Sequence, residues 1–361
     1  GLAWLNGNAN QPPMPFGLSG KKLKMIVASF PVVFFLTLLA MVVGGNKFLK
    51  DWGFETVIFS LLIGLFISNI FSIPKWLKEA LSSELFVKIG LVLLGTTVLF
   101  DDLLKAGALG LIQSCVVVFT VWNFCFWLCR KMKIDKEMSL MLSSAVSICG
   151  VSAAVATAGA IKGDKTKLSY VVSLVLVVAV PMILIMPGLA KLMGLPEDMA
   201  GAWIGGTIDT TGAVAATGAI YGEVALQTST IVKFSQNVLL GVAAFLISIY
   251  WSYSKKEVTE EKPTLKVIWL RFPKFVLGFV AASLVFSFCV APEVVSDAKP
   301  ILKNIQGMWF ALAFMSIGLE TDFKSLITSE NRRSTYAFLG AQAFNVVFTL
   351  LVAWILFGLI A

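Results

Sequence analysis

The sequence predicts an all-α polytopic membrane protein with about nine to eleven transmembrane segments, two of which are broken or re-entrant helices in inverted repeats. Three observations predict this fold class: the composition, the spacing of apolar runs, and a duplicated motif. Of the 361 residues, 58% are hydrophobic and 14% are charged. Soluble globular proteins carry about 25% charged residues, so the composition excludes that class.

Apolar runs recur along the chain, each close to the length of about 20 residues that crosses a bilayer as a helix. Two of them hold the duplicated motif. Nine full crossings with two broken or re-entrant elements is the interpretation we favour, and eleven crossings with two unwound helices is the alternative. In chain order the expected segments are 25–44, 56–73, 85–100, 106–129, 138–161, 168–190, 199–221, 228–250, 275–291, 305–319 and 336–360.

The duplicated motif lies in residues 153–163 (AAVATAGAIKG) and 212–222 (GAVAATGAIYG), and an acid follows each copy, Asp164 and Glu223. Paired, interrupted hydrophobic segments in two parts of a membrane protein are a sequence signature of a transporter's binding site. If both segments return to the side from which they came, the first enters from the cytoplasm and the second from outside. The duplicated units are then inverted repeats.

A second pair of segments supports inversion. Residues 95–104 (GTTVLFDDLL) resemble residues 317–326 (IGLETDFKSL), and the helices that follow carry Asn123 and Asn345. The helices that hold the two copies should run in opposite directions.

The net charge of +8 comes from Lys and Arg in short loops between apolar runs, concentrated on the side of Lys21, Lys22 and Lys24. This distribution follows the positive-inside rule, so we expect a cytoplasmic N-terminus and no nucleic-acid partner. Residues 1–20, rich in Gly, Asn and Pro and without an initiator Met, are predicted to be a disordered, processed or added end. Residues 21–361 are predicted to form a single transmembrane transporter domain.

Both motif segments place glycines beside hydroxyls. Glycine lets the backbone leave helical geometry, and the freed polar groups are tolerable at membrane depth only where they line a cavity enclosed by protein. A half-helix that starts after each break would direct N–H groups and a positive dipole end at the midplane, as an anion cradle. The alternative is close helix packing by small residues. The candidate binding residues are Ser147, Cys149, Gly150 and Ser152 in the first segment, and Thr207, Asp209, Thr210 and Thr211 in the second.

Lys233 is the one basic residue deep in segment 228–250, and Gln236 and Asn237 share its helix face. An unpaired charge there costs about 2.5–3.5 kcal/mol, so the side chain should face a cavity or a partner. Snorkelling from near the helix start is the alternative. Asp209, the only acid inside a motif, is the natural partner of Lys233 and could instead hold Na⁺ or H⁺.

Cys149 is expected to be a small packing residue rather than a nucleophile, because the chain has no histidine and no base lies nearby in sequence. No metal-ligand cluster, catalytic triad or cofactor loop is visible in the sequence. We therefore expect neither an enzyme nor a bound cofactor.

These motifs resemble the YeiH-like sulfate exporter family of bacterial inner-membrane proteins. The resemblance covers nearly all of the chain after Lys21 and rests on Ser-Ile-Cys-Gly-x-Ser-Ala at 147–153, Gly-Thr-x-Asp-Thr-Thr with Val-Ala-Ala at 206–216, Val-Lys at 232–233 and Ser-Ile-Gly-Leu-Glu-Thr at 316–321. It implies the inverted-repeat fold of cation/proton antiporters and anion transporters, homodimers, and a core domain moving against a scaffold. On that basis the core lies around 85–250 and 304–361, and the scaffold around 25–74 and 272–291.

The chain departs from the family at one position. Many members carry a His-Asp pair in the second motif, where this chain has Asp209-Thr210-Thr211. A proton-coupling role of that histidine therefore does not carry over.

The predicted function is secondary active transport of a small anion, with sulfate or an organosulfonate first, across the bacterial inner membrane by alternating access. Hydroxyl and N–H groups of the two motifs would bind the anion, with Lys233 as countercharge and Na⁺ or H⁺ as coupling ion. The alternatives are a cation/proton antiporter, in which Asp209 binds the ion, and a passive anion channel.

Overall fold

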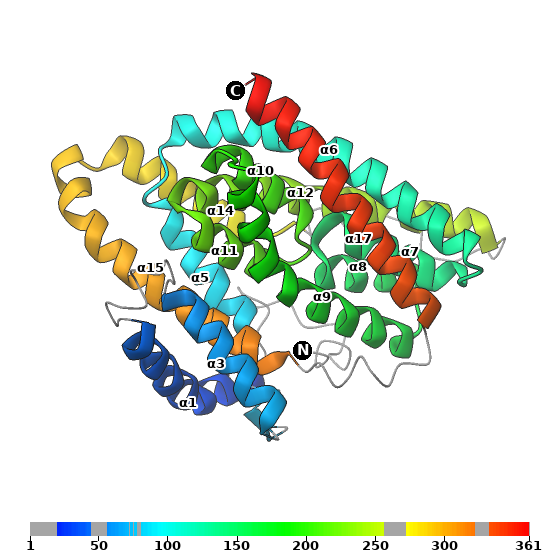
Figure 1. The fold of residues 1–361 in the computed structure, drawn as a ribbon, viewed down its shortest axis with the longest axis horizontal. Helices are drawn as coiled ribbons and strands as arrows, with labels where there is room; N and C mark the ends of the chain where they lie inside the picture. The colour runs from blue at the N-terminus through cyan, green and yellow to red at the C-terminus, as the bar shows by residue number, and fades with distance from the viewer. Residues whose placement is uncertain are drawn as a thin grey trace. The chain divides into compact units, whose positions relative to one another are not determined.

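The computed structural model describes residues 20–44, 56–71, 73–74, 76–77, 81–255, 272–321 and 332–360. Every regular element in these ranges is helical (Figure 1), which confirms the predicted all-α class. Each expected apolar segment overlaps between one and three of the helical elements. Residues 1–19 are outside the described ranges, so the prediction for the N-terminal end stays a prediction.

The α-helices keep the labels of Figure 1, and the π-helical segments are marked η. They are α1 (Gly20–Gly44), α3 (Thr56–Ile70), α5 (Ser83–Gly95), α6 (Phe100–Lys131), α7 (Lys136–Ser144), η2 (Ala145–Cys149), α8 (Val151–Ile161), α9 (Lys165–Leu192), α10 (Glu197–Thr207), α11 (Thr211–Tyr221), α12 (Glu223–Lys255), α14 (Phe275–Leu284), η3 (Val285–Cys289), α15 (Pro292–Glu320), α17 (Arg332–Ala353) and η4 (Trp354–Ile360).

Four described helices are long and apolar enough to cross a membrane: Phe100–Lys131, Lys165–Leu192, Glu223–Trp251 and Arg332–Leu359. Shorter apolar helices cover Val27–Val43, Phe59–Ile70, Val151–Ile161 and Phe275–Cys289. Helices of this length and hydropathy agree with the predicted membrane protein. The number of crossings stays a prediction.

The chain divides into two compact units, the first made of described residues within Gly1–Gly90 and Asn304–Asp322. In this unit α3 packs against the end of α15, where the Ser68 hydroxyl donates to the carbonyl oxygens of Gly318 (2.9 Å) and Thr321 (2.8 Å). Residues 322–331 lie outside the described ranges. The predicted likeness of segments 95–104 and 317–326 is therefore not tested.

The second unit comprises Leu91–Lys303 and Phe323–Ala361 and contains both motif segments. Its helices α6, α9, α12 and α17 pack around them (Figure 1). Apolar side chains of these helices form the buried core, and α10 approaches α12 closely at Gly205, where an added Cβ would collide with the backbone of Ser229. This packing encloses the polar groups of the motifs. Which residues form a moving core and which a scaffold stays a prediction.

Each motif segment is a helical hairpin. We call residues 136–161 (α7, η2 and α8) the first hairpin and residues 197–221 (α10 and α11) the second hairpin. In each, one glutamate at the start of the element accepts a backbone N–H from just beyond its end. Glu137 accepts from Asp164 N, and Glu197 accepts from Val224 N at 2.9 Å. Each pair is 27 residues apart, so the structural repeat extends beyond the duplicated sequence.

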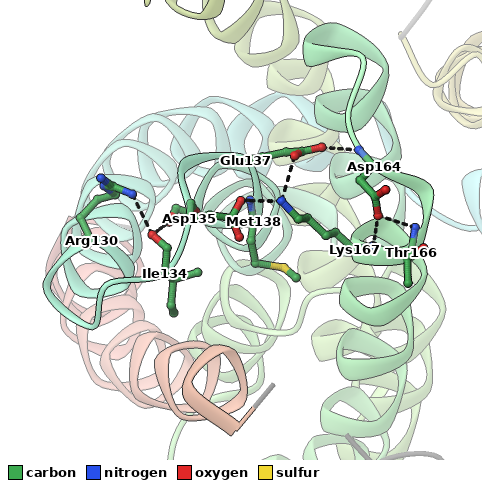
Figure 2. A network of polar contacts seen from close by, with 9 residues as sticks. Arg130, Ile134, Asp135, Glu137, Met138, Asp164, Thr166 and Lys167 are labelled. Carbon is green, nitrogen blue, oxygen red and sulfur yellow. Dashed lines mark hydrogen bonds and ion pairs between the residues drawn. The ribbon is translucent and has the colours of Figure 1, made fainter. Parts of the chain in front are cut away.

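The mouth of the first hairpin carries further ionic contacts (Figure 2). Lys167 Nζ lies 2.8 Å from Asp135 Oδ1 and 3.0 Å from Glu137 Oε2. Asp164 caps α9 by accepting the backbone N–H groups of Thr166 and Lys167 at 2.8 and 2.9 Å. These contacts join the start of α7 to the start of α9, which holds the two ends of the hairpin together.

The two mouths lie at opposite ends of α9. The first hairpin ends at Ile161, shortly before α9 begins at its cap Asp164. The second hairpin begins at Glu197, shortly after α9 ends at Leu192. With 28 residues, α9 is about 42 Å long at 1.5 Å per residue. The hairpins therefore approach each other from opposite ends of one long helix.

Candidate functional site

The tips of the two hairpins meet at Gly150. This residue has φ +60° and ψ −112°, a backbone conformation that glycine adopts readily and other residues do not. A Cβ placed there would lie 2.7 Å from Val175 Cγ1, 3.2 Å from Asp209 Cβ and 3.3 Å from Thr210 Cγ2. The first break is where the sequence predicts it, and the absence of a side chain at Gly150 allows the second hairpin to come close.

The second break lies at Ile208–Thr210, between α10 and α11. The glycines expected to produce it are helical instead: Gly205 and Gly206 lie in the last turn of α10, and Gly212 is the second residue of α11. That expectation was wrong because Ile208 and Thr210 have extended backbones, with φ −77° and −104°, which any residue adopts. The Thr210 hydroxyl then caps α11 by accepting Ala213 N at 3.2 Å.

The half-helices that lead into the breaks leave carbonyl groups without helical partners. Side-chain donors from two surrounding helices bond four of them. From α12, Lys233 Nζ donates to Ile148 O (2.7 Å) and Gln236 Nε2 to Gly206 O (3.0 Å). From α17, Asn345 Nδ2 donates to both Val146 O (3.2 Å) and Thr207 O (3.1 Å). The negative ends of the half-helices are therefore compensated within the protein.

Lys233 is 1% exposed and lies ten residues into α12, so it does not snorkel to an interface. Its ammonium donates to Ile148 O and to Gln236 Oε1 (2.8 Å). The pairing of Lys233 with Gln236 confirms the shared helix face. Asn237, the next residue, donates to Thr211 Oγ1 at 3.2 Å.

Asp209 is 1% exposed, and neither carboxylate oxygen has a hydrogen-bond partner in the described part of the chain. The ion pairs between described residues do not include it. The expected direct Lys233–Asp209 pair is thus not formed, because the lysine is already bonded to groups of the first hairpin and α12. A buried carboxylate without donors is costly when ionised, and a proton or a cation would relieve that cost.

The half-helices that leave the breaks begin at Val151 and Thr211. No side chain in the described part of the chain caps the start of α8, so its first N–H groups have no partner from capping. Ser152 is exposed, and Thr210 and Thr211 are half-buried. The positive ends are therefore the accessible part of the site, whereas the carbonyl ends are buried and bonded.

The remaining candidates, Ser147, Cys149 and Thr207, are buried in the described chain. The Ser147 hydroxyl donates to Ser143 O one turn earlier, at 2.7 Å. Cys149 is 7% exposed and packs in an apolar cluster with Ile148. Thr207 is buried, and its hydroxyl has no partner among the described residues.

Sequence reasoning missed the amide side chains that surround the tips. Gln342 donates to Thr207 O (3.0 Å) and Gln113 to Ala202 O (2.7 Å), and each is buried. The sequence pattern that could have identified both residues is an amide side chain within an otherwise apolar run. The proposed equivalence of Asn123 and Asn345 does not extend to their surroundings: Asn123 is exposed and donates to Phe119 O in its own helix, whereas Asn345 is 1% exposed.

Comparisons with known proteins find relatives that are named as membrane proteins. A UPF0324 membrane protein of Rhodopirellula baltica is 39% identical over 353 residues, covering 95% of this chain and 65% of that protein. One from Nitratidesulfovibrio vulgaris is 37% identical and covers 94% and 61%, and one from Nitrosomonas europaea is 29% identical and covers 84% and 72%. The chain thus spans less than two thirds of the length of the first two relatives.

No solved structure matches the chain. Residues 28–337 match the family described as "Conserved hypothetical protein 698". That match covers most of the chain, and the relatives are named as membrane proteins. The chain belongs to this family of membrane proteins.

Proposed function

We propose that the protein is a secondary active transporter that moves a small anion by alternating access at the two hairpin tips. In this proposal the hairpins are re-entrant, entering the membrane from opposite sides of the nine-crossing fold. The support is that their mouths lie at opposite ends of α9, while Gly150 of one tip contacts Asp209 and Thr210 of the other. Paired broken elements of this kind bind substrate near the midplane of transporters.

The choice of an anion as substrate rests on a difference between the helix ends that lead into the breaks and those that leave them. The four carbonyl groups at the incoming ends accept bonds from Lys233, Gln236 and Asn345. The outgoing end at Val151 has no side-chain cap among the described residues, and at the outgoing end at Thr211 the Thr210 hydroxyl accepts Ala213 N. Ser152 at the first end is exposed, and Thr210 and Thr211 at the second are half-buried. Helix N-termini favour negative charge, so an anion fits the open ends better than a cation does.

Sulfate or an organosulfonate is the first choice of substrate because several oxygens can each accept an N–H or hydroxyl donor. This choice agrees with the resemblance to the sulfate exporter family. We also propose a homodimer in the bacterial inner membrane with the N-terminus in the cytoplasm, following the same resemblance and the positive-inside rule.

The two buried charges near the tips suggest how transport is coupled. When Asp209 is ionised it balances Lys233, and when it is protonated the site keeps one positive charge. An anion binds the positively charged state better. By linkage, the bound anion must then raise the proton affinity of Asp209 by the same factor. The anion and a proton would therefore be carried together, with Asp209 as the proton site.

A cation/proton antiporter is the second candidate, and one observation favours it. The Asp209 carboxylate is buried and has no donor among the described residues, as expected for a group that binds Na⁺ or H⁺ in turn. In an antiporter of this kind, the only role of Lys233 is to hold the first hairpin in position. The two candidates differ in whether an anion is required for flux.

The test is uptake of labelled sulfate and methanesulfonate into proteoliposomes, with pH and sodium gradients applied separately. We expect saturable uptake with counter-transport, driven by an inward proton gradient. Lys233→Met should weaken anion affinity at least tenfold, equivalent to about 1.4 kcal/mol. Asp209→Asn should bind anion but lose the response to pH.

The matched controls are Lys299→Met and Asp297→Asn, which remove exposed charges of α15. Both should transport normally. Cation flux driven by pH without any anion would favour the antiporter, and flux that does not saturate would favour a channel. Unchanged anion transport in both Lys233→Met and Asp209→Asn would contradict the proposal.

A further inference from the structure

Asn345 of α17 is the one described side chain that donates hydrogen bonds to both hairpin tips. Its Nδ2 lies 3.2 Å from Val146 O in the first hairpin and 3.1 Å from Thr207 O in the second. Both carbonyl groups are at the incoming ends of the broken helices. A single amide has two N–H donors, so this residue uses its full donor capacity to join the two tips.

The surroundings of Asn345 fix the orientation of this amide. Thr349, one turn later on α17, donates its hydroxyl to Asn345 Oδ1 at 2.7 Å. The two carbonyl groups can only accept, so the NH₂ group faces the tips, and the oxygen faces Thr349. Gln342 adds a second donor to Thr207 O at 3.0 Å. All three side chains are buried, so water does not replace these bonds easily.

Neither contacted carbonyl belongs to the accessible part of the site. Val146 and Thr207 are buried, while the open N–H groups begin at Val151 and Thr211. Asn345 is therefore placed to act on the positions of the tips rather than on a bound solute. Anion affinity requires both sets of N–H groups to point at one solute, and small displacements of such donors weaken binding strongly.

We infer that Asn345 is a positioning residue that holds the two hairpin tips in one anion cradle, with Thr349 setting the direction of its amide. This inference rests on the proposed function for the anion. Its geometric part, the joining of the two tips, is independent of the transported solute. The two parts can be measured separately.

The geometric part is tested by the reactivity of Cys149, which directly precedes Gly150 and is 7% exposed. Cys115, Cys125, Cys129 and Cys289 are replaced by Ser or Ala, which leaves Cys149 as the single thiol. We expect Asn345→Ala and the isosteric Asn345→Asp to increase the rate of maleimide labelling of Cys149 at least tenfold. Thr349→Val, which keeps the amide, should give a smaller increase.

Two controls separate positioning from general destabilisation. Asn123→Ala removes an exposed amide that bonds only within its own helix, and it should leave Cys149 labelling unchanged. A second background retains only Cys125, which is fully buried in α6, and reports opening of the unit as a whole. Labelling of Cys149 that stays at the wild-type rate in Asn345→Ala would overturn the inference. An equal increase at Cys125 would also overturn it.

The functional part is measured as sulfate affinity of folded, monodisperse protein. Asn345→Ala should raise the dissociation constant at least tenfold, whereas Asn123→Ala should not change it. If the wild-type protein binds no anion, the proposed function fails, and the Cys149 comparison still decides whether Asn345 joins the tips. If wild-type and Asn345→Ala proteins bind sulfate equally, the positioning role fails although the anion proposal stands.

Discussion

Lys233 Nζ donates a hydrogen bond of 2.7 Å to the carbonyl oxygen of Ile148, two residues before the break at Gly150. The same ammonium bonds Gln236, whose amide donates to Gly206 O of the second hairpin. A charged residue of α12 thus connects the two tips, as Asn345 does from α17. This arrangement places a positive charge beside the open helix ends without exposing it.

Replacing Lys233 with arginine separates charge from geometry. Arg keeps the positive charge, but its planar guanidinium is larger than an ammonium and does not match the positions of the two acceptors, Ile148 O and Gln236 Oε1. The site is 1% exposed, so we expect overpacking to lower the unfolding free energy by about 1–3 kcal/mol. Sulfate affinity should fall as well. Thermal unfolding with and without sulfate measures both effects, and an unchanged affinity would show that charge alone is sufficient.

Gly150→Ala should disrupt the contact between the tips. The backbone there is strained for alanine, and the new Cβ would lie 2.7 Å from Val175 Cγ1. The two effects together should lower the unfolding free energy by about 2–6 kcal/mol and abolish transport. Gly188→Ala is the matched control, because nothing lies within 4 Å of its added Cβ. Gly188→Ala should raise the unfolding free energy by about 0.5–1 kcal/mol. Equal melting temperatures for Gly150→Ala and Gly188→Ala would refute the account of Gly150.

Glu137 and Glu197 should each stabilise only their own hairpin mouth. Each accepts the first backbone N–H groups near the start of the next helix, a role like that of an N-cap, so alanine should cost about 0.5–2 kcal/mol. Hydrogen exchange should accelerate near Asp164 in Glu137→Ala and near Val224 in Glu197→Ala. Accelerated exchange at both mouths in either variant would be inconsistent with two separate closures.

The first mouth should weaken in acid. Burial would raise the pKa of Asp135, but the hydrogen bonds from Lys167 and Met138 N outweigh it, and the pKa is lowered. The backbone N–H groups of Lys167 and Thr166 lower the pKa of Asp164. Each group therefore adds stability above its unfolded pKa of about 3.9, and this stability is lost as the pH falls through the folded pKa.

Melting temperature between pH 6 and pH 3 measures this effect. The double variant Asp135→Asn, Asp164→Asn should be less stable than the wild type at pH 6 and should lose less stability on acidification. A parallel pH dependence in the two proteins would rule out a contribution from these carboxylates.

The sequence allowed the helical class, the apolar segments and the first break to be predicted, because hydropathy and Gly150 report on them directly. The second break lies within the predicted segment, but glycines do not produce it, because Ile208 and Thr210 reach extended geometry without any glycine signal. The bonds of Lys233 and Asn345 to Val146, Ile148 and Thr207 could not be predicted, since they join main-chain atoms far apart in sequence. The sequence showed only that a lysine and an amide lie within apolar runs, at Lys233 and Asn345.

The most direct test of the central claim is an experimental map of the protein in lipid with sulfate bound. We expect both hairpin tips in contact at Gly150, with anion density within hydrogen-bond distance of N–H groups at the starts of α8 and α11. Separated tips would contradict the account. Anion density away from both helix starts would contradict it equally.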